Sequence, residues 1–331
     1  MGLFTQLVIR NKEVKNRVVL PPMATSLATP EGEVTPEILE HYQQYADGEV
    51  GTVIVEHAYV RPDGRVRDDQ LGIHEEARVP GLRKLADRLR GGKARSLIQL
   101  THAGARSLGD ADGVVWGAGN VTSRGEPGPT PLPQSGLEDL ADAFVRAAER
   151  AIEAGFDGVQ LHGAHGYLLN QFLSPLTNDR TDAFGGDLAG RGAFPLMVIR
   201  RVRRAIGPEA WLSYRLGADD QLDGGLMLEE TTQFAQELAA AGVDIVDVSG
   251  GLGGPRPEDE YREGFFLKQA KAIKAAIGDQ ARVIVTGGFV NAETADEAVR
   301  LDGVDLVGVG RILLADPYWV LKARARLLRS A

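Results

Sequence analysis

Three ring side chains with polar atoms lie close together in the segment from Asp157 to Pro175. They are His162, His165 and Tyr167. Two imidazoles three residues apart can donate hydrogen bonds to one oxygen, and a phenol keeps its proton at neutral pH because its unperturbed pKa is about 10. Together these groups can polarise a carbonyl group and protonate a neighbouring carbon.

Two other interpretations of these rings stay open from this segment alone. The histidines can be hydrogen-bonded turn residues, with Tyr167 a packed core aromatic. A zinc site is the other alternative, but zinc normally takes at least three protein ligands. The sequence offers no cysteine and no further histidine close by.

The residues before the rings predict a strand. Val159 and Leu161 suit a strand that is covered on both faces, and Gly163 interrupts regular structure directly after it. We therefore expect the rings at the carboxyl end of a buried strand.

The same order of a short apolar strand and a helix recurs along the chain. One strand is expected around Val159, and the others at 18–22, 52–60, 95–100, 211–216, 245–249, 282–286 and 306–309. Helical patterns cover 35–47, 78–90, 136–154, 191–206, 228–241, 265–277, 292–301 and 318–328. Eight such units with right-handed crossovers predict an α/β fold of the (β/α)8 TIM-barrel type, as a single domain over 1–331. An open doubly wound sheet is the alternative.

Local signals add detail to this barrel. Residues 3–10 and 13–20 alternate around Asn11 and Lys12, which predicts an N-terminal β-hairpin that caps the bottom of the barrel. Thr35 before Pro36 is typical of a capped helix start. Asp187 is a candidate cap for the helix that follows it.

Composition limits the classes of function. With 43% hydrophobic and 25% charged residues, the chain can bury a large core. It has neither a long apolar run nor a signal-peptide pattern, so we expect a cytoplasmic protein that does not enter a membrane. The absence of cysteine excludes thiolate-held clusters and cysteine catalysis, and the net charge of −9 disfavours nucleic acid as a partner. Small molecules are the expected partners.

Glycines follow the last two expected strands. Gly287 and Gly288 come after the seventh, and Gly310 with Arg311 after the eighth. Glycine lets backbone N–H groups approach a phosphate, and arginine can bind two of its oxygens at once. This location is usual for a phosphate site in such barrels, although glycines there also serve tight turns.

Two polar residues within expected strands, Gln99 and Arg215, need partners because burial without hydrogen bonds is costly. A flat ring with carbonyl groups and ring nitrogens would satisfy both, and the segment 21–25 offers it small and apolar contacts. An internal hydrogen bond would also satisfy either residue. Together with a phosphate site, these residues favour flavin mononucleotide, FMN.

Five segments of the chain resemble the old yellow enzyme family of flavin-dependent ene-reductases. They are 16–25, 99–104, 162–175, 178–186 and 307–311, and the match runs in order from about Leu3 to Lys322. The pattern His-x-x-His-Gly-Tyr with its continuation Asn-x-Arg-x-Asp-x-Phe-Gly-Gly is highly specific. The resemblance implies FMN as cofactor and NADH or NADPH as reductant.

The resemblance also implies roles for individual residues. Pro22, Met23, Ala24 and Ala58 would line the isoalloxazine ring, Gln99 and Arg215 would contact its polar edge, and Gly287, Gly288, Gly310 and Arg311 would hold the phosphate. His162 and His165 would anchor the carbonyl or nitro oxygen of an activated alkene. Tyr167 would protonate its α-carbon while FMN N5 delivers hydride to the β-carbon.

Several features stay open at this stage. Ala24 stands where relatives often carry a Thr or Cys that tunes the flavin potential. The loops 105–135 and 250–264 are expected at the barrel mouth, where they would set substrate size. An FMN-barrel tRNA dihydrouridine synthase and a flavin-binding protein with only diaphorase activity are the alternative functions. A homo-oligomer is possible.

Overall fold

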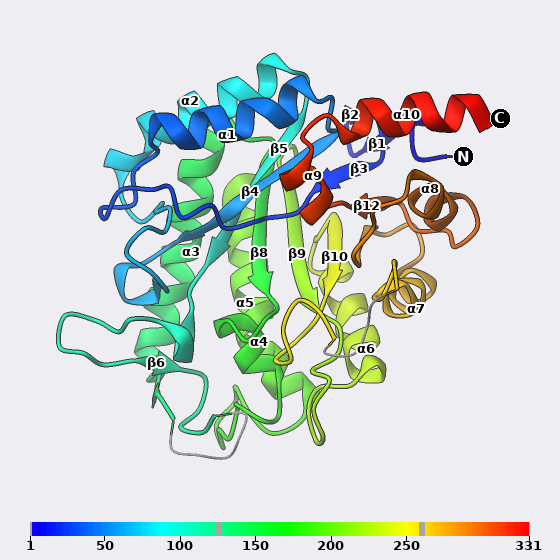
Figure 1. The fold of residues 1–331 in the computed structure, drawn as a ribbon. Coiled ribbons are helices and arrows are strands. Elements are labelled where there is room, and N and C mark those ends of the chain that lie inside the picture. The colour runs from blue at the N-terminus through cyan, green and yellow to red at the C-terminus, as the bar shows by residue number, and fades with distance from the viewer. Residues whose placement is uncertain (1, 123–127, 258–261, 331) are drawn as a thin grey trace.

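Eight parallel strands form a closed barrel at the centre of the computed structural model, which describes residues 2–122, 128–257 and 262–330. The strands are β3 (Val18–Leu20), β4 (Thr52–Tyr59), β5 (Arg95–Thr101), β8 (Gly158–Gly163), β9 (Trp211–Gly217), β10 (Ile245–Ser249), β11 (Arg282–Thr286) and β12 (Leu306–Gly308). Neighbours around the barrel follow chain order, and β12 pairs with β3 to close it. The predicted TIM barrel is confirmed (Figure 1).

Helices alternate with the strands and lie around the barrel (Figure 1). The predicted ones are α1 (Pro36–Asp47), α2 (Val79–Gly91), α3 (Gln134–Ala154), α5 (Leu188–Ile206), α6 (Leu228–Ala240), α7 (Leu267–Ile277), α8 (Ala292–Arg300) and α10 (Trp319–Ser330). Short elements not predicted are α4 (Leu168–Leu173), α9 (Arg311–Ala315), β6 (Trp116–Gly117), β7 (Thr130–Pro131) and single 3₁₀ turns at 62–64, 76–78 and 104–106. Helix α4 is buried on every side, so it shows no amphipathic period.

Two helix starts show the expected capping chemistry. Thr35 Oγ1 accepts a hydrogen bond from Ile38 N at 3.3 Å, with Pro36 in the first helical position of α1. Asp187 Oδ1 accepts from Gly190 N at 2.9 Å, and α5 consequently begins at Leu188, before the expected residue 191.

The N-terminal hairpin is present but shorter than predicted. Its arms are β1 (Leu7–Ile9) and β2 (Lys12–Val14), and the prediction that the second arm runs to residue 20 is wrong. Residues 18–20 instead pair in parallel with β4 and β12 as a barrel strand. Figure 1 shows the hairpin at the end of the barrel opposite to the one toward which β8 points.

The hairpin closes an apolar floor inside the barrel. Its buried Ile9 and Val14 form one cluster with the inward residues Val19, Ile54, Leu97, Trp211, Ile245, Ile284 and Leu306. Trp211 Nε1 donates a hydrogen bond to the carbonyl oxygen of Ile9 at 3.1 Å. Each buried aliphatic side chain of this kind contributes roughly 1.5–3 kcal/mol through removal from water. The floor therefore leaves only the opposite end of the barrel for a site.

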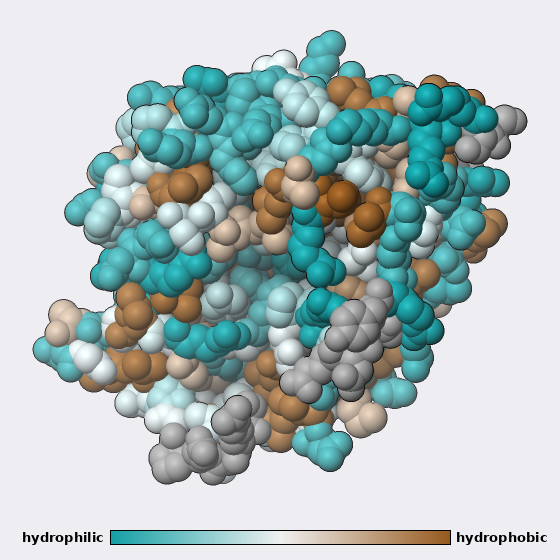
Figure 2. Space-filling view, in the orientation of Figure 1, coloured by the Kyte–Doolittle hydropathy of each residue, from teal (hydrophilic) through white to brown (hydrophobic). Residues whose placement is uncertain are grey.

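A second, larger apolar cluster fills the space between the strands and the helices. It contains strand residues such as Val53, Val55, Leu161 and Leu216 together with the inner faces of the helices. Figure 2 shows only small, separated apolar patches on the visible face of the molecule.

Strand β4 contains an irregularity that matters for the site. Its register against β5 shifts between Val55 and His57, so that Glu56 is an extra residue and His57 lies level with Gln99. Glu56 is buried, and it accepts hydrogen bonds from Thr25 N at 2.9 Å and Thr25 Oγ1 at 2.6 Å. The shift thereby fixes the loop after β3 to the neighbouring strand.

Candidate active site at the carboxyl end of the barrel

The three predicted rings are brought together at the end of β8. The ring centroids of His162 and Tyr167 lie 4.5 Å apart, and those of His162 and His165 lie 5.1 Å apart. His57 of β4, which no sequence pattern indicated, belongs to the same cluster, with its ring centroid 5.5 Å from that of Tyr167 and 6.3 Å from that of His162. The cluster therefore contains three imidazoles and one phenol.

His162 is a buried residue near the last position of β8. Its Nδ1 is buried without a hydrogen-bond partner among the described residues. Burial lowers the pKa of His162 well below its usual value, and the nearby His165 and Arg215 lower it further. The imidazole is therefore neutral at pH 7, which leaves one N–H that can donate to a ligand.

One ring nitrogen of His165 already has a hydrogen-bond partner within the protein. Its Nε2 lies 2.7 Å from Ser249 Oγ at the end of β10, and its backbone has a positive φ of 59°. Arg215 Nη2 donates to the same Ser249 oxygen at 3.4 Å. Ser249 thus connects the ring cluster to Arg215, a link that no sequence pattern indicated.

Tyr167 lies half-buried between the rings and the loop after β5. The guanidinium of Arg106 lies over its ring at 5.6 Å, and Arg106 Nη1 donates to the carbonyl oxygen of His165 at 2.5 Å. Burial raises the pKa of the Tyr167 phenol, while the charges of Arg106 and Arg67 oppose the rise. The phenol therefore carries its proton at neutral pH.

Polar side chains continue from the rings into the upper barrel interior. Gln99 Nε2 donates to Gln160 Oε1 at 2.8 Å, and Gln160 Nε2 donates to Asp247 Oδ2 at 3.2 Å. Asp247 also accepts from Thr286 Oγ1 at 3.2 Å and lies 3.5 Å from Arg215 Nε. Gln99 thus has the internal partner that the sequence left as an alternative. Burial raises the pKa of the Asp247 carboxyl, which Arg215 opposes.

A cavity of about 210 Å³ opens beside this network. Five predicted cofactor residues line it: Met23, Arg215, Gly288, Gly310 and Arg311. Phe265 and Arg256 are further lining residues that sequence reasoning missed, because they lie in a loop with no recognisable motif.

The lining residues fit a cofactor with a phosphate and a polar ring. Arg215 Nε is buried without a hydrogen-bond partner in the described part of the chain, and its ion-pair partner Asp247 Oδ2 lies 3.5 Å away, so the guanidinium can still donate to a ligand. A Cβ at Gly288 would lie 3.2 Å from Arg311 Nη2 and 2.7 Å from the Phe265 ring, and the glycine has a φ of 72°. Only glycine leaves the backbone open next to the guanidinium.

The remaining predicted cofactor residues are not part of this lining, although Pro22, Ala24 and Gly287 adjoin lining residues in the chain. Pro22 is partly exposed and Ala24 is exposed, both in the loop after β3. Gly287 accepts a hydrogen bond from Gly264 N at 2.6 Å through its carbonyl oxygen. Ala58 packs in the apolar cluster under the helices, and the ring contacts come from its neighbour His57.

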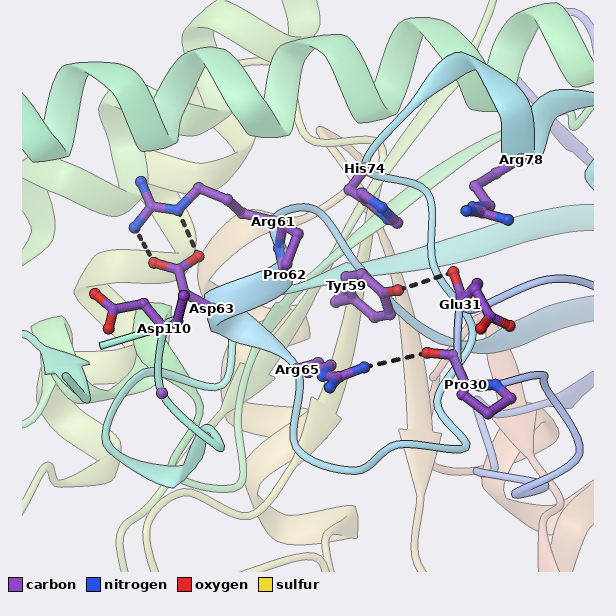
Figure 3. A pocket seen from close by; sticks show the side chains of 12 residues that line it. Pro30, Glu31, Tyr59, Arg61, Pro62, Asp63, Arg65, His74, Arg78 and Asp110 are labelled. Carbon is purple, nitrogen blue, oxygen red and sulfur yellow. Dashed lines mark hydrogen bonds and ion pairs between the residues drawn. The ribbon is translucent and has the colours of Figure 1, made fainter. Parts of the chain in front are cut away.

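A larger cavity of about 750 Å³ lies elsewhere, over the loop after β4. Arg61 donates to Asp63 at 2.6 Å and 2.5 Å, and Arg65 donates to the carbonyl oxygen of Pro30 at 3.1 Å (Figure 3). Arg78 lies 2.5 Å from carboxyl oxygens of both Glu33 and Glu75. Because its guanidinium groups already have partners, this cavity has no evident preference for a ligand charge.

Metal-binding clusters and membrane-spanning helices are both absent from the described ranges. No group of three or more His, Asp or Glu side chains is arranged there to hold a metal ion. No helix within these ranges has the length and apolar character needed to cross a membrane.

The fold and the site together define a closed (β/α)8 barrel with a cavity next to a cluster of polar rings at the carboxyl ends of its strands. A family model described as the NADH:flavin oxidoreductase / NADH oxidase family matches residues 2–329. The chain belongs to this family, the old yellow enzyme family, and is a flavin oxidoreductase that uses FMN and NADH or NADPH.

Named relatives agree with this assignment. An NADH oxidase of Thermoanaerobacter brockii is 36% identical over 98% of this chain but only 50% of its own length. An NADPH dehydrogenase of Halalkalibacterium halodurans is 34% identical over 98% of this chain and 94% of that protein. The NADPH dehydrogenase of Bacillus subtilis is also 34% identical, over 98% and 95%.

Solved structures show the same fold. A 2-naphthoyl-CoA reductase complex superposes with a TM-score of 0.91 at 26% identity, covering 98% of this chain and 52% of the other. Morphinone reductase in complex with tetrahydroNAD gives a TM-score of 0.83 at 26% identity, covering 98% and 91%.

Proposed function

We propose that this protein is an ene-reductase that reduces the activated carbon–carbon double bond of small α,β-unsaturated carbonyl or nitro compounds. FMN, when bound, would supply the hydride transfer from NADH or NADPH to the β-carbon of the alkene. The protein's own residues would bind the electron-withdrawing group and provide the proton.

The residue roles follow from the arrangement of the rings. His162 has a neutral imidazole, and its buried Nδ1 lacks a hydrogen-bond partner among the residues that the structure describes, so His162 would bind the substrate oxygen. His165 would help to bind the same substrate oxygen while its Nε2 is hydrogen-bonded to Ser249 Oγ. Hydrogen bonds to this oxygen strengthen as negative charge develops on it, so they lower the barrier and not only the ground state.

Tyr167 would give its proton to the α-carbon. The ring centroids of Tyr167 and His162 lie 4.5 Å apart, and burial raises the pKa of the phenol, which keeps it protonated. Met23, Arg215, Gly288, Gly310 and Arg311 would hold FMN in the cavity that they line, with Pro22, Ala24, Gln99 and Gly287 close to it. Ala58, which stands next to His57 in β4, would line the isoalloxazine ring as the resemblance implies.

The observation that carries this proposal is the link between the two halves of the site. Arg215 lines the cofactor cavity and donates to Ser249, which in turn contacts His165 of the ring cluster. A protein that only bound flavin would not need the hydrogen-bond donors of the ring cluster next to its cofactor cavity.

A turnover assay tests the proposal. FMN-loaded protein should oxidise NADH or NADPH faster when 2-cyclohexenone is added under anaerobic conditions, and the saturated ketone should accumulate. NAD(P)H oxidation with quinones or oxygen but with no activated alkene would support the diaphorase alternative. Reduction of uridine in tRNA would support the synthase alternative, which the net charge of −9 disfavours.

A further inference from the structure

His57 is the one member of the ring cluster that the proposed function does not use. It is 8% exposed, and the shift in β4 at Glu56 places it level with Gln99 of β5. Its ring centroid lies 5.5 Å from Tyr167 and 6.3 Å from His162. The position is therefore next to the expected proton donor.

The hydrogen bonds of Gln70 fix which nitrogen of His57 carries the proton. Gln70 Oε1 accepts from Val66 N at 2.8 Å, which identifies the other end of the amide as its NH₂ group. That NH₂ group contacts the carbonyl oxygen of His57 at 3.1 Å and His57 Nδ1 at 2.9 Å. An amide NH₂ donates and does not accept, so Nδ1 must be the unprotonated nitrogen.

The proton of the neutral ring is consequently on Nε2. This nitrogen has no hydrogen-bond partner among the described residues. Burial lowers the pKa of His57 to about 4, and Arg67 and Arg215 add to the effect. The imidazole thus stays neutral and presents one fixed N–H donor at the site.

We propose that His57 is a substrate-recognition residue whose Nε2–H binds a second acceptor oxygen, one carried by the α-carbon of the alkene. This inference rests on the proposed function, because it assumes that Tyr167 protonates that carbon. A donor beside Tyr167 meets whatever substituent the α-carbon bears. The favoured substrate class is then doubly activated alkenes, such as enones with an ester on the α-carbon.

The test compares two substrates that differ in that group: 2-cyclohexenone and the same enone with a methyl ester on its α-carbon. His57→Phe keeps an aromatic ring and removes the donor, whereas His57→Gln keeps a neutral N–H. His41→Ala, on the outer helix α1, is the matched control. We expect His57→Phe to lower kcat/KM about 10- to 100-fold for the ester and less than about twofold for cyclohexenone. His57→Gln should retain most of the preference for the ester.

Two outcomes would overturn the assignment while leaving the proposed function intact. Equal losses on both enones, with a shifted flavin potential, would place His57 on the cofactor; no loss on either would remove it from substrate recognition. Nitrogen-15 NMR of the unliganded holoenzyme gives a readout besides turnover, and a proton on Nδ1 would also refute the argument. If the wild-type protein reduces neither enone, the proposed function fails and this assignment falls with it.

Discussion

Replacement of Tyr167 by phenylalanine separates the proposed proton donor from the rest of the site. The change removes one oxygen and keeps the aromatic ring. The centroid of that ring lies 4.5 Å from the centroid of the His162 ring and 5.6 Å from Arg106 Cζ. No described residue is hydrogen-bonded to the Tyr167 hydroxyl, so the substitution leaves no buried donor or acceptor without its partner. We therefore expect a change of less than about 0.5 kcal/mol in the free energy of unfolding.

The effect on catalysis should be much larger. General acid catalysis by a positioned group contributes roughly 10²- to 10⁴-fold, or about 3–5 kcal/mol of barrier. We expect this loss only in the half-reaction with 2-cyclohexenone, because reduction of FMN by NAD(P)H needs no proton at a substrate carbon. Anaerobic stopped-flow absorbance of the flavin measures the two half-reactions separately.

Two comparisons make this test decisive. Reoxidation by dioxygen should be unchanged in the variant, and Tyr318→Phe, at a position 46% exposed on the surface, should match the wild type in every step. Equal losses in both half-reactions, or full activity toward the enone, would refute the assignment of Tyr167 as the proton donor.

Four further predictions follow from the same contacts. His162→Ala should weaken phenol binding to the oxidised holoenzyme about 10-fold, measured by charge-transfer absorbance; an unchanged titration would remove His162 from the ligand site. Gly288→Val should release FMN on dialysis, because its φ of 72° and the nearby Arg311 leave no space. Ile9→Ala should cost about 2–4 kcal/mol in urea unfolding without changing the FMN spectrum. Between the unfolded pKa near 6.5 and the folded value of about 4, His57 binds more protons when unfolded. Its own contribution should therefore lower the free energy of unfolding by about 2 kcal/mol from pH 7.5 to pH 5, measured as the difference in urea unfolding between the wild type and His57→Phe; the same pH dependence in both proteins would contradict that pKa.

The barrel was predictable because its strands and helices have strong and regular patterns. Short apolar runs and amphipathic helices alternate eight times, and the structure places strands at all the expected positions. The predicted hairpin is too long because it extends one strand over residues 13–20, although three consecutive polar residues at 15–17 interrupt the alternation and residues 18–20 join the barrel. Helix α4 escaped detection because a helix buried on all sides has no polar face.

The site was predictable where a motif encodes it and unpredictable where tertiary contacts do. His162, His165 and Tyr167 stand in one short segment that also folds into one place. His57 was missed because strand periodicity cannot locate the extra residue at Glu56. Ser249 was missed because its partner, His165, is distant in the sequence. Of the two mouth loops, residues 123–127 and 258–261 lie outside the described ranges.

The chain of amides and carboxylate that crosses the barrel interior has a consequence for how such an enzyme can diversify. Gln99, Gln160, Asp247 and Thr286 come from four different strands and are linked by hydrogen bonds, and Gln160 Nε2 also donates to Ser213 Oγ. Replacing any of them leaves a hydrogen-bond donor or acceptor of a neighbouring residue buried without a partner. This lowers the free energy of unfolding by about 1–3 kcal/mol. Laboratory evolution toward new alkenes should therefore accumulate its accepted changes in the mouth loops and leave these interior positions untouched.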